Sequence, residues 1–125
     1  MGPDRRGAKD NTDGDRAEAL AEALLRRHGL RLLARNYRVK GGEIDLICQD
    51  GATLVFVEVR LRRNAAFGGA AASITRSKRQ RLLLAARHYL LGRGERPCRF
   101  DCVLFSRLDP DAAEWIRNAF SADEA

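Results

Sequence analysis

The sequence has no long apolar run, although hydrophobic residues make up 45% of its 125 positions. No stretch approaches the roughly 20 apolar residues of a membrane-spanning helix, which argues against a membrane partner. The first fifteen residues, Met1 to Asp15, carry charges of both signs and no apolar core, so they do not resemble a secretory signal. We therefore expect a cytoplasmic protein in which residues 1–15 form a disordered tail.

Cysteine and histidine are also scarce. The three cysteines, Cys48, Cys98 and Cys102, are odd in number and lack C-x-x-C spacing, which disfavours both a disulfide framework and a structural zinc site. We expect them to be buried as small apolar side chains, and free thiols fit a reducing compartment. The two histidines, His28 and His88, stand alone in or beside apolar helical stripes and are expected to be structural.

Acidic residues are nearly absent from one long stretch. Between Arg60 and Arg99 the sequence has eleven lysines or arginines against one acid, a net charge of +10, whereas the whole chain carries +6. Such a stretch attracts a polyanion by Coulomb attraction and counterion release. A solvated basic face is the alternative. We favour contact with nucleic acid, and the candidate binding residues are Arg62, Arg63, Arg76, Lys78, Arg79 and Arg81.

Apolar periodicity predicts two helices. The first runs from Arg16 to His28, with Asp15 as its N-cap and Gly29 as its stop. The second begins at Ser73 or Thr75 and ends near Leu91. In the second helix Lys78 precedes the buried Leu82 by four residues and so lies at the N-terminal end of the apolar face. Arg79, Arg81 and Arg87 are expected to point elsewhere.

Strands are predicted over residues 30–39, 43–48, 53–62 and 99–105, because these segments are rich in β-branched and aromatic side chains. The segment around Trp115 is either a short helix or a strand. This order predicts an α/β domain over residues 16–125, with a mixed central sheet of about four to five strands flanked by helices. The glycine-containing loop over residues 64–72 is expected to be the most mobile segment.

The second and third strands form the clearest hairpin. With Asp50 and Gly51 as the two central residues of its turn, Asp45 faces Phe56 and is a diagonal neighbour of Glu58. Side chains alternate along a strand, so one surface carries Glu43, Asp45, Ile47, Leu54, Phe56, Glu58 and Arg60. The opposite surface is apolar throughout and is expected to be the core; it carries Ile44, Leu46, Cys48, Val55, Val57, Val59 and Leu61.

Two acidic residues in the middle of such apolar strands need an explanation, because burial of a carboxylate costs several kcal/mol unless something neutralises it. Asp45 and Glu58 lie close enough in this register to converge on one hard cation. The alternative is an ion pair of either acid with Arg60 or another arginine. We favour a metal site.

An aspartate followed by a strand that ends in Glu-x-Lys or Glu-x-Arg, after a helix that carries a glutamate, resembles the PD-(D/E)XK nuclease superfamily. The chain is more closely similar to the YraN family of small bacterial proteins, which resembles archaeal Holliday junction resolvases. The resemblance rests on segments in a fixed order: Ala17-Glu18, Leu33 to Arg38, Gly42 to Ile47, Leu54 to Arg60, Phe67-Gly68, Lys78, Ala86, Tyr89-Leu90 and Arg99 to Asp101.

The resemblance implies the restriction-endonuclease-like fold and a metal-dependent endonuclease that hydrolyses DNA, with branched or structured DNA as the expected substrate. Asp45 and Glu58 would bind Mg²⁺ or Mn²⁺, and Glu18 would reach in from the first helix. The third residue of the signature is usually lysine and here is Arg60, which cannot act as a general base and could only hold a phosphate or a water. Lys78 is the other candidate for that role. A homodimer is expected by analogy with resolvases, which must cut two strands.

Two other function classes stay open. One is a nucleic-acid-binding module that keeps the scaffold without efficient catalysis, which Arg60 at the lysine position allows. The other is a protein-interaction subunit whose basic face meets an acidic partner. Outside the proposed site, Asp101 is expected to pair with a basic residue, and Glu22 is expected to be solvated.

Overall fold

One mixed sheet joins all the strands of the described chain. The structure is a computed structural model that describes residues 12–62 and 74–122. The expected loop 64–72 and Arg63 therefore lie outside the described residues. In chain order the elements are α2 (Asp13–Arg27), β1 (Arg31–Val39), β2 (Gly42–Asp50), β3 (Thr53–Leu61), α3 (Arg76–Leu90), β4 (Cys98–Phe105), η2 (Pro110–Ala112) and β5 (Ala113–Phe120).

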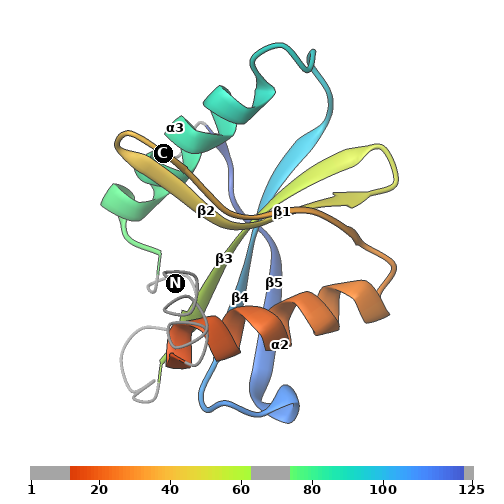
Figure 1. Cartoon of the computed structure of the whole chain (residues 1–125), viewed down its shortest axis with the longest axis vertical. Helices are drawn as coiled ribbons and strands as arrows, with labels where there is room; N and C mark the ends of the chain where they lie inside the picture. The colour runs from red at the N-terminus through yellow and green to blue at the C-terminus, as the bar shows by residue number, and fades with distance from the viewer. Residues whose placement is uncertain (1–11, 63–73, 123–125) are drawn as a thin grey trace, which may run out of the picture.

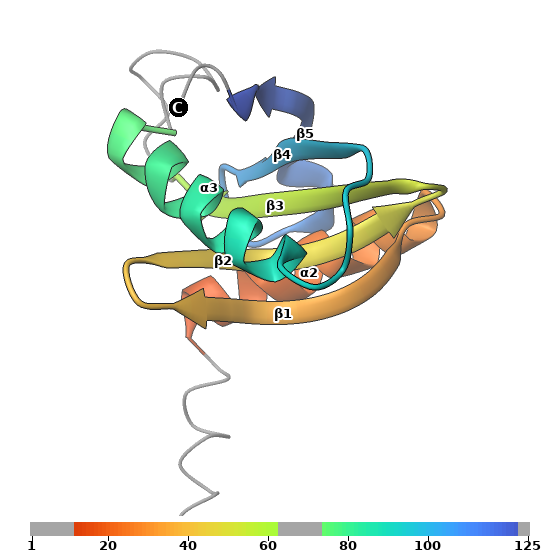
Figure 2. The same cartoon turned by 90° about the horizontal axis from the view of Figure 1, so that it is seen from above.

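The strands lie side by side in the order in which they occur in the chain. β3 and β4 are parallel, and the other neighbouring pairs are antiparallel. Parallel neighbours need a crossover connection, and α3 lies in that connection. Figures 1 and 2 show α2 and α3 on opposite sides of the sheet. The predicted α/β restriction-endonuclease-like fold is confirmed, with five strands and flanking helices.

Helix α2 begins earlier than the sequence pattern predicted. The hydroxyl of Thr12 accepts a hydrogen bond from the Asp15 backbone N–H at 3.1 Å, so Thr12 is the N-cap and Asp15 lies inside the helix. The predicted N-cap was wrong because Asp13, Gly14 and Asp15 belong to the first helical turn. Acidic side chains are favourable there, since their negative charge interacts with the positive end of the helix dipole. Residues 13–15 are therefore not part of a tail, and residues 1–11 lie outside the described residues. The predicted stop is confirmed, since Gly29 has a φ of +87°.

Helix α3 has Thr75 as its N-cap, one of the two predicted residues. Its buried face carries Leu82, Ala85, Ala86 and Tyr89, as the periodicity predicted. Among the described residues, no helix combines the length and apolarity needed to cross a membrane. The segment around Trp115, left open between helix and strand, is strand β5.

The hairpin of β2 and β3 has a different register from the predicted one. Asp50 pairs with Thr53 and Leu46 with Val57, so the central turn residues are Gly51 and Ala52. Gly51 has a φ of +61°, the left-handed conformation that glycine adopts readily. The shift is two residues relative to the predicted register. An even shift leaves each side chain on its predicted face, so the expected surfaces of the hairpin are largely kept.

Both faces of the sheet are packed, whereas the sequence predicted one core face. Leu46, Cys48, Val55 and Val57 pack with α2, and a second cluster that includes Ile47, Leu54 and Phe56 packs with α3. The alternation breaks at one point: Ile44 packs into the cluster of α3, although Leu46, two residues on, packs into that of α2. The residue between them is Asp45, so the irregularity in β2 occurs at the proposed metal ligand.

Helix α3 rests directly on the first residue of β2. A Cβ atom at Gly42 would lie 2.5 Å from the Arg81 carbonyl oxygen and 3.1 Å from the Ala85 nitrogen. Real Cβ atoms do not approach backbone atoms that closely, so only glycine allows this contact. Gly42→Ala is therefore expected to destabilise the protein by about 2 kcal/mol in urea denaturation, because α3 must move away.

The matched control is Gly14→Ala, which adds a Cβ where no atom of residues 12–62 or 74–122 lies within 4 Å, and it is expected to be neutral or slightly stabilising. If the two variants were equally stable, the close approach of α3 would be disproved.

A buried aspartate joins β4 to β5. The Asp101 carboxylate accepts hydrogen bonds from Arg99 Nε at 3.0 Å, Trp115 Nε1 at 2.9 Å and the Asn118 backbone N–H at 2.9 Å. The expected pairing with a basic residue is confirmed. Asn118 has a φ of +53°, and the β4–β5 register shifts near Asp101, so the carboxylate satisfies an irregular stretch of the sheet.

Asp101→Asn is expected to lower the free energy of unfolding by about 2 kcal/mol, because an amide nitrogen would replace one acceptor among three donors. Thermal or urea denaturation measures this loss. Unchanged stability would show that the three hydrogen bonds contribute nothing to β5.

The cysteines divide into two kinds. Cys48 and Cys102 are buried, as predicted, and burial raises the pKa of each thiol to about 12. Cys98 is exposed, so its predicted burial was wrong. It stands at the first position of β4, where the strand has not yet entered the core.

Candidate functional site

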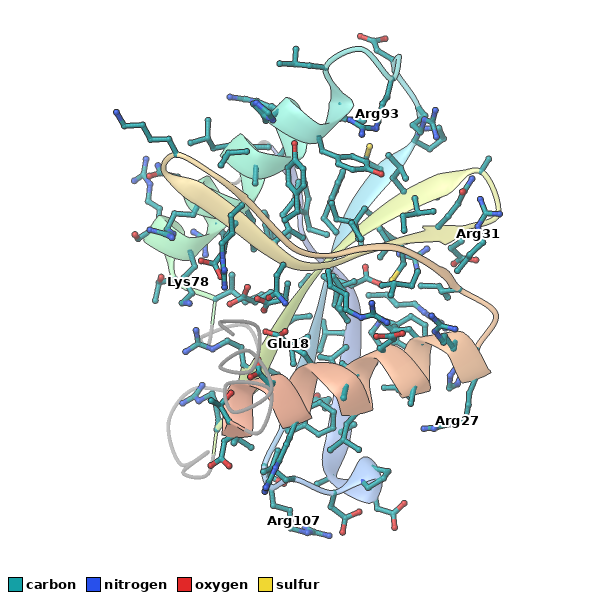
Figure 3. All side chains as sticks on the ribbon, in the orientation of Figure 1. Glu18, Arg27, Arg31, Lys78, Arg93 and Arg107 are labelled. Carbon is teal, nitrogen blue, oxygen red and sulfur yellow. The ribbon has the colours of Figure 1, made fainter. Side chains whose placement is uncertain are left out.

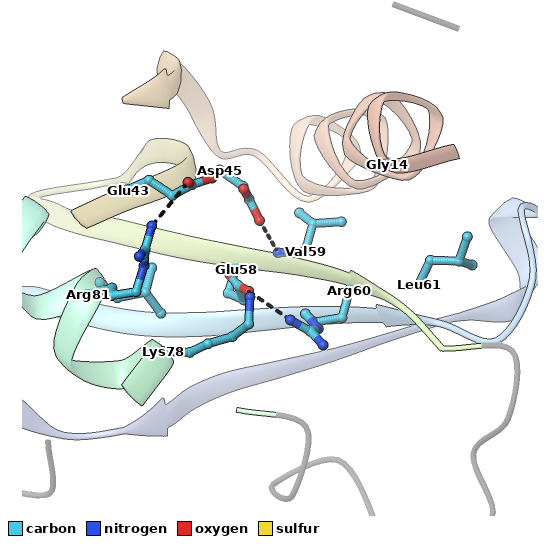
Figure 4. A pocket seen from close by; sticks show the side chains of 10 residues that line it. Gly14, Glu43, Asp45, Glu58, Val59, Arg60, Leu61, Lys78 and Arg81 are labelled. Atoms are coloured by element: carbon cyan, nitrogen blue, oxygen red, sulfur yellow. Dashed lines mark hydrogen bonds and ion pairs between the residues drawn. The ribbon is translucent and has the colours of Figure 1, made fainter. Parts of the chain in front are cut away.

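A cleft of about 380 Å³ opens beside the middle of the sheet (Figure 4). It lies between the N-terminal parts of the two helices, since Gly14 of α2 and Lys78 of α3 both line it. Three acidic and three basic side chains share the cleft with three apolar ones and Gly14; the lining is Gly14, Glu43, Asp45, Glu58, Val59, Arg60, Leu61, Lys78, Arg81 and Leu82. The structure therefore brings four of the five predicted catalytic residues together: Asp45, Glu58, Arg60 and Lys78.

Asp45 is buried at the point where the hairpin pairing ends. Its Oδ2 accepts the Val59 backbone N–H at 2.8 Å, one residue beyond Glu58 (Figure 4). Burial and the neighbouring Glu58 charge raise the pKa of Asp45 to about 8, although the Val59 hydrogen bond acts in the other direction. Two carboxylates therefore lie close together with little water, an arrangement that favours a shared proton or a cation.

Glu58 faces two cations. Lys78 Nζ lies 3.5 Å and Arg60 Nη1 lies 3.6 Å from the same carboxylate oxygen, Oε2. The Glu58 side chain is 8% exposed, whereas those of Lys78 and Arg60 are 43% and 30% exposed. The predicted alternative, an ion pair of Glu58 with Arg60, is thus present, but at the long end of the range for such contacts. Lys78 lies at the N-terminal end of the buried face of α3, as predicted.

Sequence reasoning missed one pair of residues in the cleft. Arg81 Nη2 lies 3.5 Å from Glu43 Oε1, and both side chains line the cleft. Arg81 was expected to point away from Lys78, which was wrong because α3 packs on Gly42 and so brings Arg81 next to Glu43. Glu43 shares its predicted surface with Asp45 and Glu58, and that alternation was the available signal.

Glu18 does not line the cleft with Asp45 and Glu58. It lies on the side of α2 that faces the sheet (Figure 3) and lines a neighbouring hollow of about 290 Å³ with Glu22, Arg35 and Asn36. Burial, followed by the charge of Asp15, raises the pKa of Glu18. Its own charge contributes to raising the pKa of Asp45, so the two sites are coupled electrostatically.

Glu22 was expected to be solvated, which was wrong. Both of its carboxylate oxygens accept hydrogen bonds from Arg35 on β1, at 2.8 and 2.9 Å, and Arg26 contacts it at 2.9 Å. The hydrogen bond from Arg35 lowers the pKa of Glu22. The Glu22–Arg35 pair attaches α2 to β1, so the role of Glu22 is structural.

The comparisons with known proteins place the chain in a family. The sequence profile of an uncharacterised protein family, UPF0102, matches residues 17–105. This chain belongs to the UPF0102 family. It is 60% identical over 109 residues to a UPF0102 protein of Methylobacillus flagellatus, covering 87% of this chain and 96% of the relative. It is 57% identical over 119 residues to a UPF0102 protein of Dechloromonas aromatica, covering 94% and 97% respectively. The predicted YraN family is thereby confirmed.

The profile match of the UPF0102 family spans every acidic and basic residue of the cleft, from Glu43 to Arg81. It also spans Glu18. It ends at Phe105, so β5 and its contacts with Asp101 lie beyond it. Of the residues that line the cleft, only Gly14 lies outside the matched segment.

Three further predicted binding residues of this UPF0102 protein, Arg62, Arg76 and Arg79, do not line the cleft. Arg62 follows β3 and donates its backbone N–H to Phe105, and Arg76 is an exposed residue at the start of α3. Arg79 is partly buried and donates from Nη1 to the Ile74 carbonyl at 2.8 Å, which ties down the N-terminal end of α3. Arg63 lies outside the described residues.

Both histidines have protein partners, in agreement with a structural role. His28 Nδ1 is 3.0 Å from the Leu24 carbonyl oxygen, and its ring packs edge-on against Trp115. His88 Nδ1 is 2.7 Å from the Tyr37 hydroxyl.

The donor set of the cleft fits a hard divalent cation in part. Among the described residues, no group of three or more acidic, histidine or cysteine side chains is placed to hold a metal ion. Asp45 and Glu58 provide two buried carboxylates, however, and Mg²⁺ is commonly bound by one or two carboxylates together with water and substrate phosphate. The arrangement thus fits a metal that is completed by substrate, and Glu18 would have to act from farther away.

Proposed function

We propose that this protein is a metal-dependent endonuclease that hydrolyses phosphodiester bonds of DNA in the cleft. The observation that carries the proposal is the burial of Asp45 and Glu58 side by side in a cleft that three cationic side chains also line. Two buried carboxylates side by side repel each other and destabilise the fold. A bound divalent cation would remove this repulsion by neutralising their charges.

Asp45 and Glu58 are the residues that would hold Mg²⁺ or Mn²⁺, with Glu18 as a further, more distant candidate. A bound metal ion would polarise the phosphate and lower the pKa of a water molecule. Within the chain itself, the Val59 N–H fixes the orientation of Asp45, and the two cations at Glu58 fix that of the second carboxylate. The carboxylates are thus positioned before any ligand arrives.

Lys78 and Arg60 are proposed to hold the reacting phosphate. Both are partly exposed, and both approach one oxygen of Glu58, so a phosphate beside Glu58 comes within their reach. Arg60 stays charged at any physiological pH and is limited to binding the phosphate and stabilising charge in the transition state. Lys78, which lines the cleft from α3, is the proposed substitute for the lysine of the nuclease signature.

DNA is the proposed substrate class because Arg60, Lys78 and Arg81 of the cleft belong to the stretch from Arg60 to Arg99, which carries a net charge of +10. A preference for branched or structured DNA, the action of the protein as a homodimer and its location in the cytoplasm are parts of the same proposal. The substrate preference and the homodimer rest on the resemblance to resolvases, and the cytoplasmic location rests on the free thiols.

A second function is a nucleic-acid-binding module without efficient catalysis. The contacts of both Lys78 and Arg60 with Glu58 favour it, because cations that neutralise a carboxylate also compete with a metal. In this case DNA binding shows a steep salt dependence, with no hydrolysis in Mg²⁺ or Mn²⁺. A flat salt plot contradicts both functions and leaves a protein partner as the explanation.

The test is a cleavage assay with Mg²⁺ on flap, Y-form, four-way and linear DNA. The proposal predicts cleavage of at least one substrate by the wild type and none by Glu58→Ala. Cleavage that survives this substitution would place the activity in a contaminant or at another site. No cleavage by the wild type, together with tight binding, would favour the second function.

A further inference from the structure

The Glu43–Arg81 pair lies nearer to solvent than the two buried acids of the cleft. The side chains of Arg81 and Glu43 are 53% and 39% exposed, and their closest atoms are 3.5 Å apart. An exposed ion pair at this distance contributes little to stability, typically less than about 1 kcal/mol. Little energy is therefore needed to separate Arg81 from Glu43.

The backbone of Arg81 is fixed in the place where this pair forms. The Arg81 carbonyl oxygen lies directly against Gly42, where no Cβ fits, and Gly42 precedes Glu43 in β2. Lys78 stands three residues before Arg81, so both residues lie on the same side of α3 and line the same cleft. The packing of α3 on β2 thus directs two cations of one helix into the cleft.

We propose that Arg81 binds a second phosphate of the DNA strand, beside the one assigned to Lys78 and Arg60, and that Glu43 competes with this phosphate as a latch. The inference rests on the proposed DNA substrate. A guanidinium group matches the paired oxygens of a phosphate, and this contact is stronger than a long pair with one exposed carboxylate. Entry of DNA therefore transfers Arg81 from Glu43 to the phosphate, and the freed Glu43 remains in solvent.

The latch predicts effects of opposite sign for its two members. Arg81→Ala loses a phosphate contact, so it weakens DNA binding about tenfold and lowers the slope of the log-log salt plot by about one. Glu43→Gln removes the competitor and leaves Arg81 available, so it tightens binding about threefold or more. In Arg81→Ala the Glu43→Gln substitution loses this effect, because nothing is left to release.

The experiment measures binding of a fluorescein-labelled DNA duplex in EDTA at several salt concentrations. Arg87→Ala is the control for Arg81, because it removes the same charge from an exposed position of α3 outside the cleft lining. Glu114→Gln, an exposed residue of β5, is the control for the loss of one negative charge. Arg81→Lys keeps the charge without the paired donors and is expected to recover part of the affinity.

Equal affinities of Arg81→Ala and Arg87→Ala would overturn the assignment of Arg81. The latch would be overturned if Glu43→Gln acted no more strongly than Glu114→Gln, or acted equally with and without Arg81. A wild type that does not bind the duplex at low salt would overturn both. Because no metal is present, a failure of Mg²⁺-dependent cleavage alone contradicts the proposed nuclease and leaves this result standing.

Discussion

Asp45→Asn is expected to lower the rate of DNA cleavage by on the order of a thousandfold and to leave DNA binding in EDTA intact. The amide keeps the shape of the side chain and an oxygen that can accept the Val59 N–H. It removes the negative charge that a divalent cation requires, and loss of a metal ligand removes most of the stabilisation of the transition state. Cleavage at saturating DNA with Mg²⁺ and binding without metal measure the two effects separately.

Asp101→Asn is the matched control for this substitution. It makes the same chemical change at another buried aspartate of the sheet, whose partners are Arg99, Trp115 and Asn118. It is expected to lower stability and to keep the cleavage rate per folded molecule. If Asp45→Asn cleaved DNA as fast as the wild type, the role assigned to Asp45 would be wrong.

The stability of the metal-free protein is expected to fall as the pH rises from about 5 to about 8. Burial beside Glu58 raises the pKa of Asp45 to about 8, far above its value in the unfolded chain. A group with a raised carboxyl pKa binds its proton more tightly in the folded state, so its contribution is complete below the unfolded pKa and is lost as pH approaches the folded one. The loss amounts to several kcal/mol, since each unit of difference corresponds to about 1.4 kcal/mol.

Urea denaturation in EDTA at both ends of this range measures the effect. Asp45→Asn cannot titrate, so its stability is expected to change much less with pH and to exceed that of the wild type at the upper end. Added Mg²⁺ is expected to restore the stability of the wild type there, because the cation replaces the lost proton. If the stability of wild type and variant changed with pH in the same way, the raised pKa of Asp45 would be disproved.

Much of the site could be predicted from the sequence because it depends on alternation along strands. Asp45 and Glu58 share a surface in the predicted register and in the observed one, since the two registers differ by two residues. Lys78 could likewise be placed from its spacing to Leu82. Periodicity thus sufficed for the residues whose direction is set by a single element.

The register itself could not be read from the turn sequence. Asp50-Gly51 is a common pair of central turn residues, but Gly51 and Ala52 form the turn, because the observed register aligns the apolar residues Leu46 to Cys48 with Val55 to Val57. At the start of α2, Thr12 and Asp15 are both good N-caps. Thr12 is the cap because residues 13–15 have helical backbone, and the sequence pattern does not show this.

Glu43 and Arg81 were missed as a pair because contact between two distant elements decides their position. The approach of α3 to Gly42 brings them together, and a sequence shows only that a glycine is present. For the same reason the one-sided core was wrong: the apolar residues Ile47, Leu54 and Phe56 on the charged face are explained only by the packing of α3. Helix placement is a property of the whole fold.

The most direct test of the account is to locate the divalent cation on the protein. Mn²⁺ added in small amounts broadens the NMR signals of nuclei close to its binding site. If Asp45 and Glu58 hold the cation, the amide signals of Asp45, Glu58 and Val59 broaden first in the wild type, and this broadening is absent in Asp45→Asn. Broadening that spares these three amides in the wild type, or that is unchanged in the variant, would disprove the metal site.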